Sequence, residues 1–292
     1  MINSIDKYKQ AGRIARRALR EIGGLVRANA KVLDICERIE SIIIEGGGKP
    51  AFPCNVCIND VAAHYTSPPN DDATIPPRSV VKVDLGVHVE GCIVDTARTV
   101  ALDPSFAEQV KVAEGALTSG IEEVRDGVSI SSVSRAIQGH IEEAGYKPIW
   151  NLTGHKIDRY VLHTGKSIPN VVRHSAGKLR SGEIYAIEPF VTEIHGKGEV
   201  THTGEAYIFR FDKARSTKNR EERELADWIR NNFRGLPFTK RWLPPDRRDA
   251  LPGLLSRKII RPYPVLIEAG GGKVTQAEQT IVVTKDGCLV LT

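Results

Sequence analysis

One short stretch of the chain alternates strictly between apolar and polar residues, and it limits the fold more than any other. From Val81 to Val89 the odd positions hold valine or leucine, and the even positions hold lysine, aspartate, glycine and histidine. A period of two is the pattern of a half-buried β-strand. Glu90-Gly91 then predicts a tight turn, and residues 92–100 predict the returning strand. We therefore expect a hairpin with one face in a core.

This hairpin carries two aspartates. If the turn has two residues, Val89 pairs with Cys92. Asp84 then faces Ala97, and Asp95 lies on the same face, so the two carboxylates are diagonal neighbours roughly 5.5–8 Å apart. Burying them together without a cation would be costly, or would keep one protonated. A longer turn would separate them, and two solvent-facing acids on an edge hairpin are the simpler alternative.

Three residues further along the chain could complete a cation site. His155 follows a glycine, and Glu188 and Glu278 lie in or beside apolar strand patterns, where an unpaired charge is rare. Each is weak evidence alone, because most such residues are solvated. Together with the two aspartates they offer oxygen and imidazole ligands, which suit hard or borderline divalent ions.

The rest of the chain mixes helical and strand patterns. We expect helices over 5–30, 31–45, 105–124, 130–144 and 221–233, and further strands over 56–59, 160–163, 184–194, 200–211, 263–268, 279–285 and 288–291, with a turn at Pro53 and Asn55. These patterns predict an α+β fold with a mostly antiparallel sheet. The charged, proline-rich stretch 212–258 predicts an inserted helical subdomain, which leaves 1–211 and 259–292 as the main domain.

The distribution of charge and apolar residues also limits where the protein works. No run of about 18 apolar residues is present, and the first twenty residues carry six Lys/Arg without an apolar block, so we expect a cytoplasmic protein without a membrane span. The formal net charge is +5. Residues 210–261 hold fifteen Lys/Arg and seven Asp/Glu. Such a segment favours phosphate, although a solvated helical face is the simpler interpretation.

At this point the chain resembles the methionine aminopeptidases, specifically the type II branch in its short, archaeal-like form. The matching stretches span most of the chain: Ala62–Thr66, Val83–His88, Asp95–Ala97, Asn151–His155, Leu162–Lys166, Ala186–Phe190, Pro262–Pro264 and Gln276–Ile281. The 212–258 insert falls where type II members carry their helical subdomain.

The resemblance implies the pita-bread fold, with a curved antiparallel sheet covered by helices. It also implies a site for two divalent ions (Co, Mn, Fe or Zn), with a hydroxide bridging them, held by Asp84, Asp95, His155, Glu188 and Glu278. In the family pattern Asp95 and Glu278 bridge the ions, Asp84 completes one ion, and His155 and Glu188 complete the other. Glu188 is the expected proton acceptor from the attacking water.

Further residues match the family's substrate site. His64 and His163 correspond to two histidines that bind the scissile amide and the oxyanion. Phe52, Leu162 and Tyr263 fall where the family lines its methionine slot. Two residues beside Glu278 depart from the pattern, since Ala277 replaces a common phenylalanine and Gln279 a common histidine. Because neighbouring groups orient metal ligands, we expect that the metal affinity or the pocket shape near Glu278 differs from that of the family.

The resulting hypothesis is a metal-dependent aminopeptidase that removes the initiator methionine from peptides and nascent proteins. We expect a monomer that docks on the ribosome through the basic residues 210–261. Two alternatives stay open: a non-catalytic pita-bread module that binds RNA or the ribosome, and a peptidase for X-Pro sequences or dipeptides.

Overall fold

The predicted hairpin lies at the centre of the first half of the molecule. The computed structural model describes residues 2–173 and 177–292. Strands β3 (Val80–Val89) and β4 (Cys92–Ala101) are antiparallel, with Val89 paired to Cys92. Glu90 and Gly91 both have positive φ, 50° and 87°, as a two-residue turn between twisted strands requires. The predicted register is therefore confirmed.

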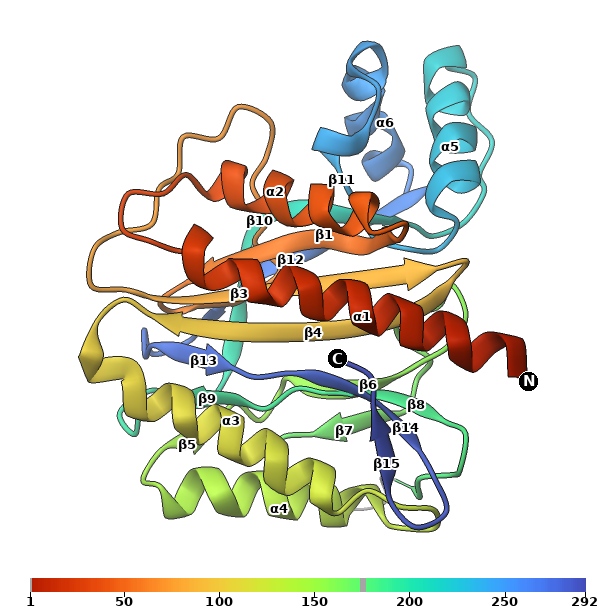
Figure 1. Cartoon of the computed structure of the whole chain (residues 1–292). Helices are drawn as coiled ribbons and strands as arrows, with labels where there is room; N and C mark the ends of the chain where they lie inside the picture. The colour runs from red at the N-terminus through yellow and green to blue at the C-terminus, as the bar shows by residue number, and fades with distance from the viewer. Residues whose placement is uncertain (1, 174–176) are drawn as a thin grey trace.

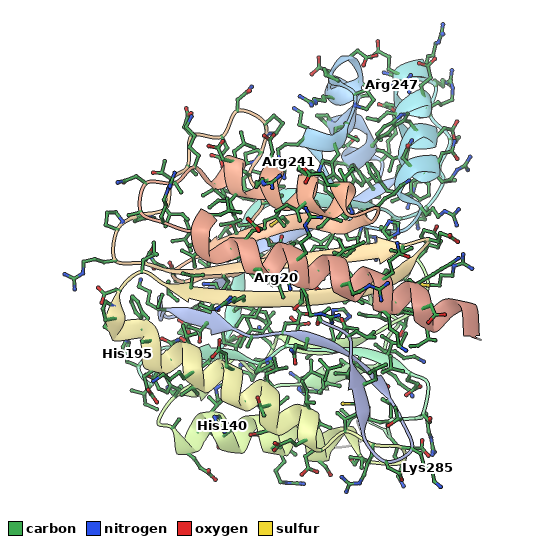
Figure 2. All side chains as sticks on the ribbon, in the orientation of Figure 1. Arg20, His140, His195, Arg241, Arg247 and Lys285 are labelled. Atoms are coloured by element: carbon green, nitrogen blue, oxygen red, sulfur yellow. The ribbon has the colours of Figure 1, made fainter. Side chains whose placement is uncertain are left out.

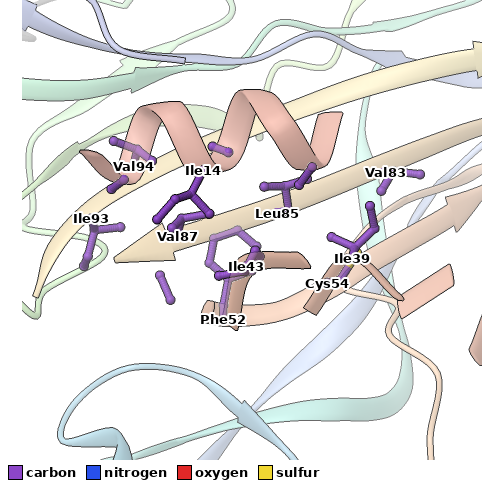
Figure 3. Close-up of a cluster of buried hydrophobic side chains, with 14 of the residues drawn as sticks. Ile14, Ile39, Ile43, Phe52, Cys54, Val83, Leu85, Val87, Ile93 and Val94 are labelled. Atoms are coloured by element: carbon purple, nitrogen blue, oxygen red, sulfur yellow. The ribbon is translucent and has the colours of Figure 1, made fainter. Parts of the chain in front are cut away.

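Two helices cover one face of this sheet. Strand β1 (Lys49–Ile58) joins β3, and α1 (Ile2–Leu25) and α2 (Val32–Glu45) pack on the same side of the three strands. Figure 3 shows Leu85 and Val87 near Ile14 and Ile43 in this layer, with Val83 further along the strand near Ile39. The even positions of β3 consequently face the other way, toward the interior of the molecule.

The second half repeats this layering. Helices α3 (Ala107–Glu122) and α4 (Ile130–Glu143) cover strands of the C-terminal half (Figure 1). The remaining strands are β2 (Val61–Ala63), β5 (Lys147–Pro148), β6 (Thr153–Ile157), β7 (Ser167–Pro169), β8 (Ile184–Ile187), β9 (Phe190–Thr192), β10 (Val200–Phe211), β11 (Phe238–Thr239), β12 (Ile260–Glu268), β13 (Val274–Gln276), β14 (Gln279–Val283) and β15 (Cys288–Val290). They form the sheets β15-β14-β8-β6-β7, β13-β9-β5 and β11-β10-β12-β2. The pairings between these strands are antiparallel, which confirms the predicted α+β class.

Residues between β10 and β12 project from one end of the molecule (Figure 1). They form α5 (Arg220–Phe233), β11, two short 3-10 turns and α6 (Leu251–Ser256), around an apolar cluster that also includes Phe209 and Ile260 of the sheet. Arg247 lies at the projecting tip (Figure 2). At the base, Arg241 donates to both carboxylate oxygens of Glu40 on α2, each at 2.9 Å. That these residues form a subdomain of their own stays a prediction.

Two local predictions were wrong. Residues 160–163 are a turn and loop rather than a strand, because Tyr160 has a φ of 58° and Asp158 and Val161 exchange backbone hydrogen bonds across it. The expected turn at Pro53 and Asn55 is instead part of β1, where register shifts absorb the proline. None of the helices in the described ranges is long and apolar enough to cross a membrane.

Candidate metal centre

The interior face of the hairpin forms one wall of a cavity, and the structure brings all the predicted site residues to it. Asp84 and Asp95 line the same cavity, which confirms that they share a face of the hairpin. The other predicted residues that line it are Phe52, His64, His155, Leu162, His163, Glu188, Tyr263 and Glu278. Residues from nine separate stretches of the chain therefore converge here.

The two glutamates reach the cavity through matching interruptions of two paired strands. Gln276 pairs with Phe190, and Gln279 pairs with Ile187, so the register places Glu278 opposite Glu188. The ladder is broken between these pairs because Pro189 has no N–H to donate. Both glutamates sit in this gap and face the cavity.

The segment that carries Glu278, immediately before β14, is also hydrogen-bonded to the aspartate hairpin. The Glu278 N–H donates to the Ala97 carbonyl at 3.2 Å, and Thr96 Oγ1 donates to the Glu278 carbonyl at 2.8 Å. The Asp95 N–H donates to Thr280 Oγ1 at 2.7 Å. These bonds fix the main chain of β4 against that of β14, so the carboxylates of Asp95 and Glu278 are held together before any ligand binds.

Three buried side chains form the tightest group. Asp95, His155 and Glu278 each offer one ligand atom, and these atoms lie within 4.8 Å of one another. His155 Nε2 is 3.5 Å from Asp95 Oδ2 and 3.5 Å from Glu188 Oε1. Pairing of His155 with Ala186 of β8 positions the imidazole beside the glutamates. A carboxylate-rich group with one imidazole matches the donor set of Mn, Fe, Co or Zn.

The charges of this group call for a cation. Burial raises the pKa of Asp84, Glu188 and Glu278 well above the usual range, and the neighbouring carboxylates raise it further. Burial raises the pKa of Asp95 to about 8 and lowers that of His155 to about 4. Among the described residues, Asp84 Oδ1 and Asp95 Oδ1 are buried without a hydrogen-bond partner. These orphaned oxygens and the neutral imidazole fit divalent ions.

Metal-free protein should lose stability as the pH rises from about 5 to 8. The pKa of Asp95 is about 8 in the folded state and about 4 in the unfolded chain. The folded state therefore holds more protons between these values, and its stability falls with rising pH. Thermal melting of chelated protein at pH 5 to 8 measures this. Metal-loaded protein is the control and should show a weaker slope, and a chelated protein that melts higher at pH 8 than at pH 5 contradicts the expectation.

Two further histidines flank the group. His64 has a φ of 68°, an unusual conformation for a residue other than glycine, and its Nδ1–H donates to the Pro264 carbonyl at 3.1 Å. This bond leaves Nε2 as an acceptor, because burial lowers the pKa of His64 and keeps the ring neutral. The ring of His163 lies 4.1 Å from that of His155. Burial and the two neighbouring histidines lower the pKa of His163 to about 2.

Apolar side chains line the rest of the cavity. Phe52 lies directly across from Gly86 on β3, where a Cβ would approach the phenyl ring to 2.3 Å. Glycine at this position therefore makes room for the ring beside Asp84. Leu162 and Tyr263 line the same space. The result is a slot that an unbranched apolar side chain can fill.

Sequence reasoning missed two polar neighbours of the acids. Asn55 Nδ2 donates to Asp84 Oδ2 at 3.3 Å, and Gln276 Nε2 donates to Glu278 Oε2 at 3.3 Å. Gln276 could have been found, since it lies two positions before Glu278 on the same strand face. The departures at 277 and 279 point away from the cavity: Ala277 packs in the core under α3 and α4, and Gln279 donates to the Thr292 carbonyl at 2.9 Å.

Comparisons with known proteins agree with this geometry. Residues 6–285 match metallopeptidase family M24. The chain is 41% identical to the methionine aminopeptidase of Methanothermobacter thermautotrophicus over 100% of both chains, and 42% identical to that of Saccharolobus solfataricus over 99% and 98%. Among solved structures, a thermophilic Arx1 superposes with a TM-score of 0.85 (18% identity; 100% of this chain and 91% of that chain), and the methionine aminopeptidase of Thermotoga maritima with 0.74 (23%; 100% and 97%).

These structural neighbours share the predicted pita-bread fold. The sequence relatives are matched from end to end at a level of identity that makes the assignment secure. The chain belongs to metallopeptidase family M24, among the methionine aminopeptidases.

Proposed function

We propose that this protein removes the N-terminal methionine from peptides and nascent proteins with the help of two divalent metal ions. The convergence of Asp84, Asp95, His155, Glu188 and Glu278 on one buried face carries the proposal. Asp95, His155 and Glu278, whose ligand atoms lie within 4.8 Å of one another, would hold the ions together with Asp84 and Glu188. When bound, the ions lower the pKa of a shared water and polarise the scissile carbonyl.

The surrounding side chains then have distinct tasks. Glu188 is in the cavity with a raised pKa, so it can hold the proton taken from the attacking water. His64 presents an acceptor Nε2 to the N–H of the scissile amide, since its Nδ1–H is held by Pro264. His163, neutral beside His155, can donate one N–H to the developing oxyanion. Phe52, Leu162 and Tyr263 hold the methionine side chain and exclude water.

Purified protein should release methionine from a Met-Ala peptide when Mn, Co, Fe or Zn is supplied, and chelation should stop the release. The reason is that a bound metal lowers the pKa of the attacking water. Without metal, Glu188 has no acidified water from which to take a proton. Release of free methionine across the metal panel is the measurement. Peptides with another first residue, and X-Pro peptides, are the controls. Preferential cleavage of X-Pro peptides would instead support the alternative peptidase. No cleavage of any peptide with any of the metals would support a non-catalytic binding module.

The basic residues 210–261 motivate a further part of the proposal. We expect a cytoplasmic monomer that docks near emerging chains, because clustered Lys/Arg binds phosphate. Arg247 lies at the projecting tip and is partly exposed for such contact (Figure 2). Co-sedimentation with ribosomes that weakens with salt, and that is lost when this tip is neutralised, would support the docking. Ribosome association that is unchanged by added salt and by neutralisation of the tip would contradict the docking.

A further inference from the structure

Strand β10 ends beside the cavity with an arginine on the face that lines it. Ile208 lines the cavity, and Arg210 follows two positions later, so both side chains leave the strand on the same side. Phe209 and Phe211 point the other way, into the apolar cluster under α5. Ile208 is buried and Arg210 is half-buried. Arg210 therefore lies on the same face of β10 as Ile208, two residues further along the strand and closer to solvent.

The register of the sheet fixes the neighbours of Arg210. Ile208 pairs with Tyr263 of β12, which lines the cavity, and Arg210 pairs with Arg261. On the other side, the pairing of Phe209 with Phe238 brings the cavity-lining Pro237 alongside Arg210. Burial raises the pKa of the Tyr263 hydroxyl, and the charge of Arg210 lowers it. Arg210 thus stands at the rim of the cavity.

The charge of Arg210 has no counter-ion in the described parts of the chain. Its cross-strand neighbour Arg261 has an acid of its own, since Arg261 Nε lies 2.9 Å from Asp212 Oδ2. The Arg210 side chain makes neither an ion pair nor a hydrogen bond with any residue in those ranges. A half-buried guanidinium with all its donors available is suited to bind a carboxylate through two parallel hydrogen bonds.

We propose that Arg210 selects substrates that carry a carboxylate a few residues beyond the scissile bond. This inference rests on the proposed function, which places the first residue beside Tyr263 and the scissile bond at the buried acids. Asp95 and Glu278 are buried whereas Arg210 is half-buried, so a peptide whose scissile bond lies at the acids extends past Arg210 toward solvent. An extended peptide advances about 3.3–3.6 Å per residue. An acidic side chain at the third to fifth residue can therefore reach Arg210.

A peptide series can test this assignment. The host is an amidated Met-Ala hexapeptide with Asp, Asn or Lys placed in turn at the third, fourth and fifth residues. At one of these positions, kcat/KM should be roughly threefold to tenfold higher for Asp than for Asn, the range expected of one partly exposed ion pair. Arg210→Gln should reduce the Asp/Asn ratio to one, and Arg210→Glu should make Lys the preferred residue. A tripeptide with a free C-terminal carboxylate, compared with its amide, shows whether Arg210 also binds a terminal carboxylate.

The ratio is measured within each variant, so a partly unfolded preparation does not change it. Lys218→Gln is the matched control: Lys218 is an exposed cation before α5, and its loss should leave the ratio at the wild-type value. Equal rates for Asp, Asn and Lys peptides in the wild type would overturn the role of Arg210 and leave the peptidase function standing. If none of the peptides is cleaved with any metal, the proposed function itself fails.

Discussion

Asp95→Ala should lower kcat/KM for a Met-Ala peptide by at least about 10³-fold, because several kcal/mol of transition-state stabilisation depend on the bound ions. Asp95 belongs to the tightest ligand group, and its oxygen lies 3.5 Å from His155 Nε2. Asp95 would hold the metal from the centre of the buried group, so a neighbouring side chain cannot replace it. Steady-state kinetics and the metal content after dialysis are the measurements, and both should fall together.

Loss of activity in this variant must be separated from loss of the fold. The buried charge of Asp95 raises the pKa of Asp84, Glu188 and Glu278, so removing this carboxyl relieves repulsion in metal-free protein. The melting temperature of chelated Asp95→Ala should therefore equal or exceed that of the chelated wild type at pH 8. Asp246→Ala changes an acid that is 78% exposed and should leave activity intact. More than a tenth of wild-type activity in Asp95→Ala would show that the metal site lies elsewhere.

His163→Ala should lower kcat by about 10²–10³-fold with the metal content unchanged, which is the usual loss for one oxyanion donor. The ring is neutral, because burial and the neighbouring histidines hold the pKa of His163 near 2. It lies beside His155 without being part of the tightest ligand group. Its removal therefore affects the reacting carbonyl more than the metal.

The measurements for this variant are kcat, KM and metal content determined on one preparation. His202→Ala is the matched control, since His202 is exposed on β10 and should leave all three values unchanged. A fall in bound metal that equals the fall in kcat would instead make His163 a ligand. An unchanged kcat would remove it from the reaction altogether.

The parts of this site that lie on regular strands could be predicted from the sequence. The common face of Asp84 and Asp95 followed from the alternation together with a two-residue turn at Glu90-Gly91, and the structure has this turn. Convergence of the hairpin with His155, Glu188 and Glu278 could not follow from local pattern, because the hairpin belongs to a different sheet from the strands β6, β8 and β14 that carry or adjoin these residues. It came from the resemblance to a known family.

The failures have local physical causes. The apolar residues Val161 and Leu162 suggested a strand, but the left-handed Tyr160 packs its ring against Gly91 of the hairpin turn and reverses the chain. The resulting loop delivers Leu162 and His163 to the cavity. The bond from Asn55 to Asp84 was hidden because irregular pairing before Asn55 shifts the register of β1, and no sequence pattern reveals such a shift.

The fastening of β14 to β4 has a consequence for how the molecule matures. The hairpin with its two acids is synthesised about 180 residues before the segment with Glu278 that bonds to it, since Thr96 Oγ1 and Glu278 are 182 positions apart. These contacts between distant parts of the chain give the fold a high contact order and a slow final step. A growing polypeptide therefore gains catalytic competence only after its closing strands dock, so incomplete products of synthesis carry no active peptidase.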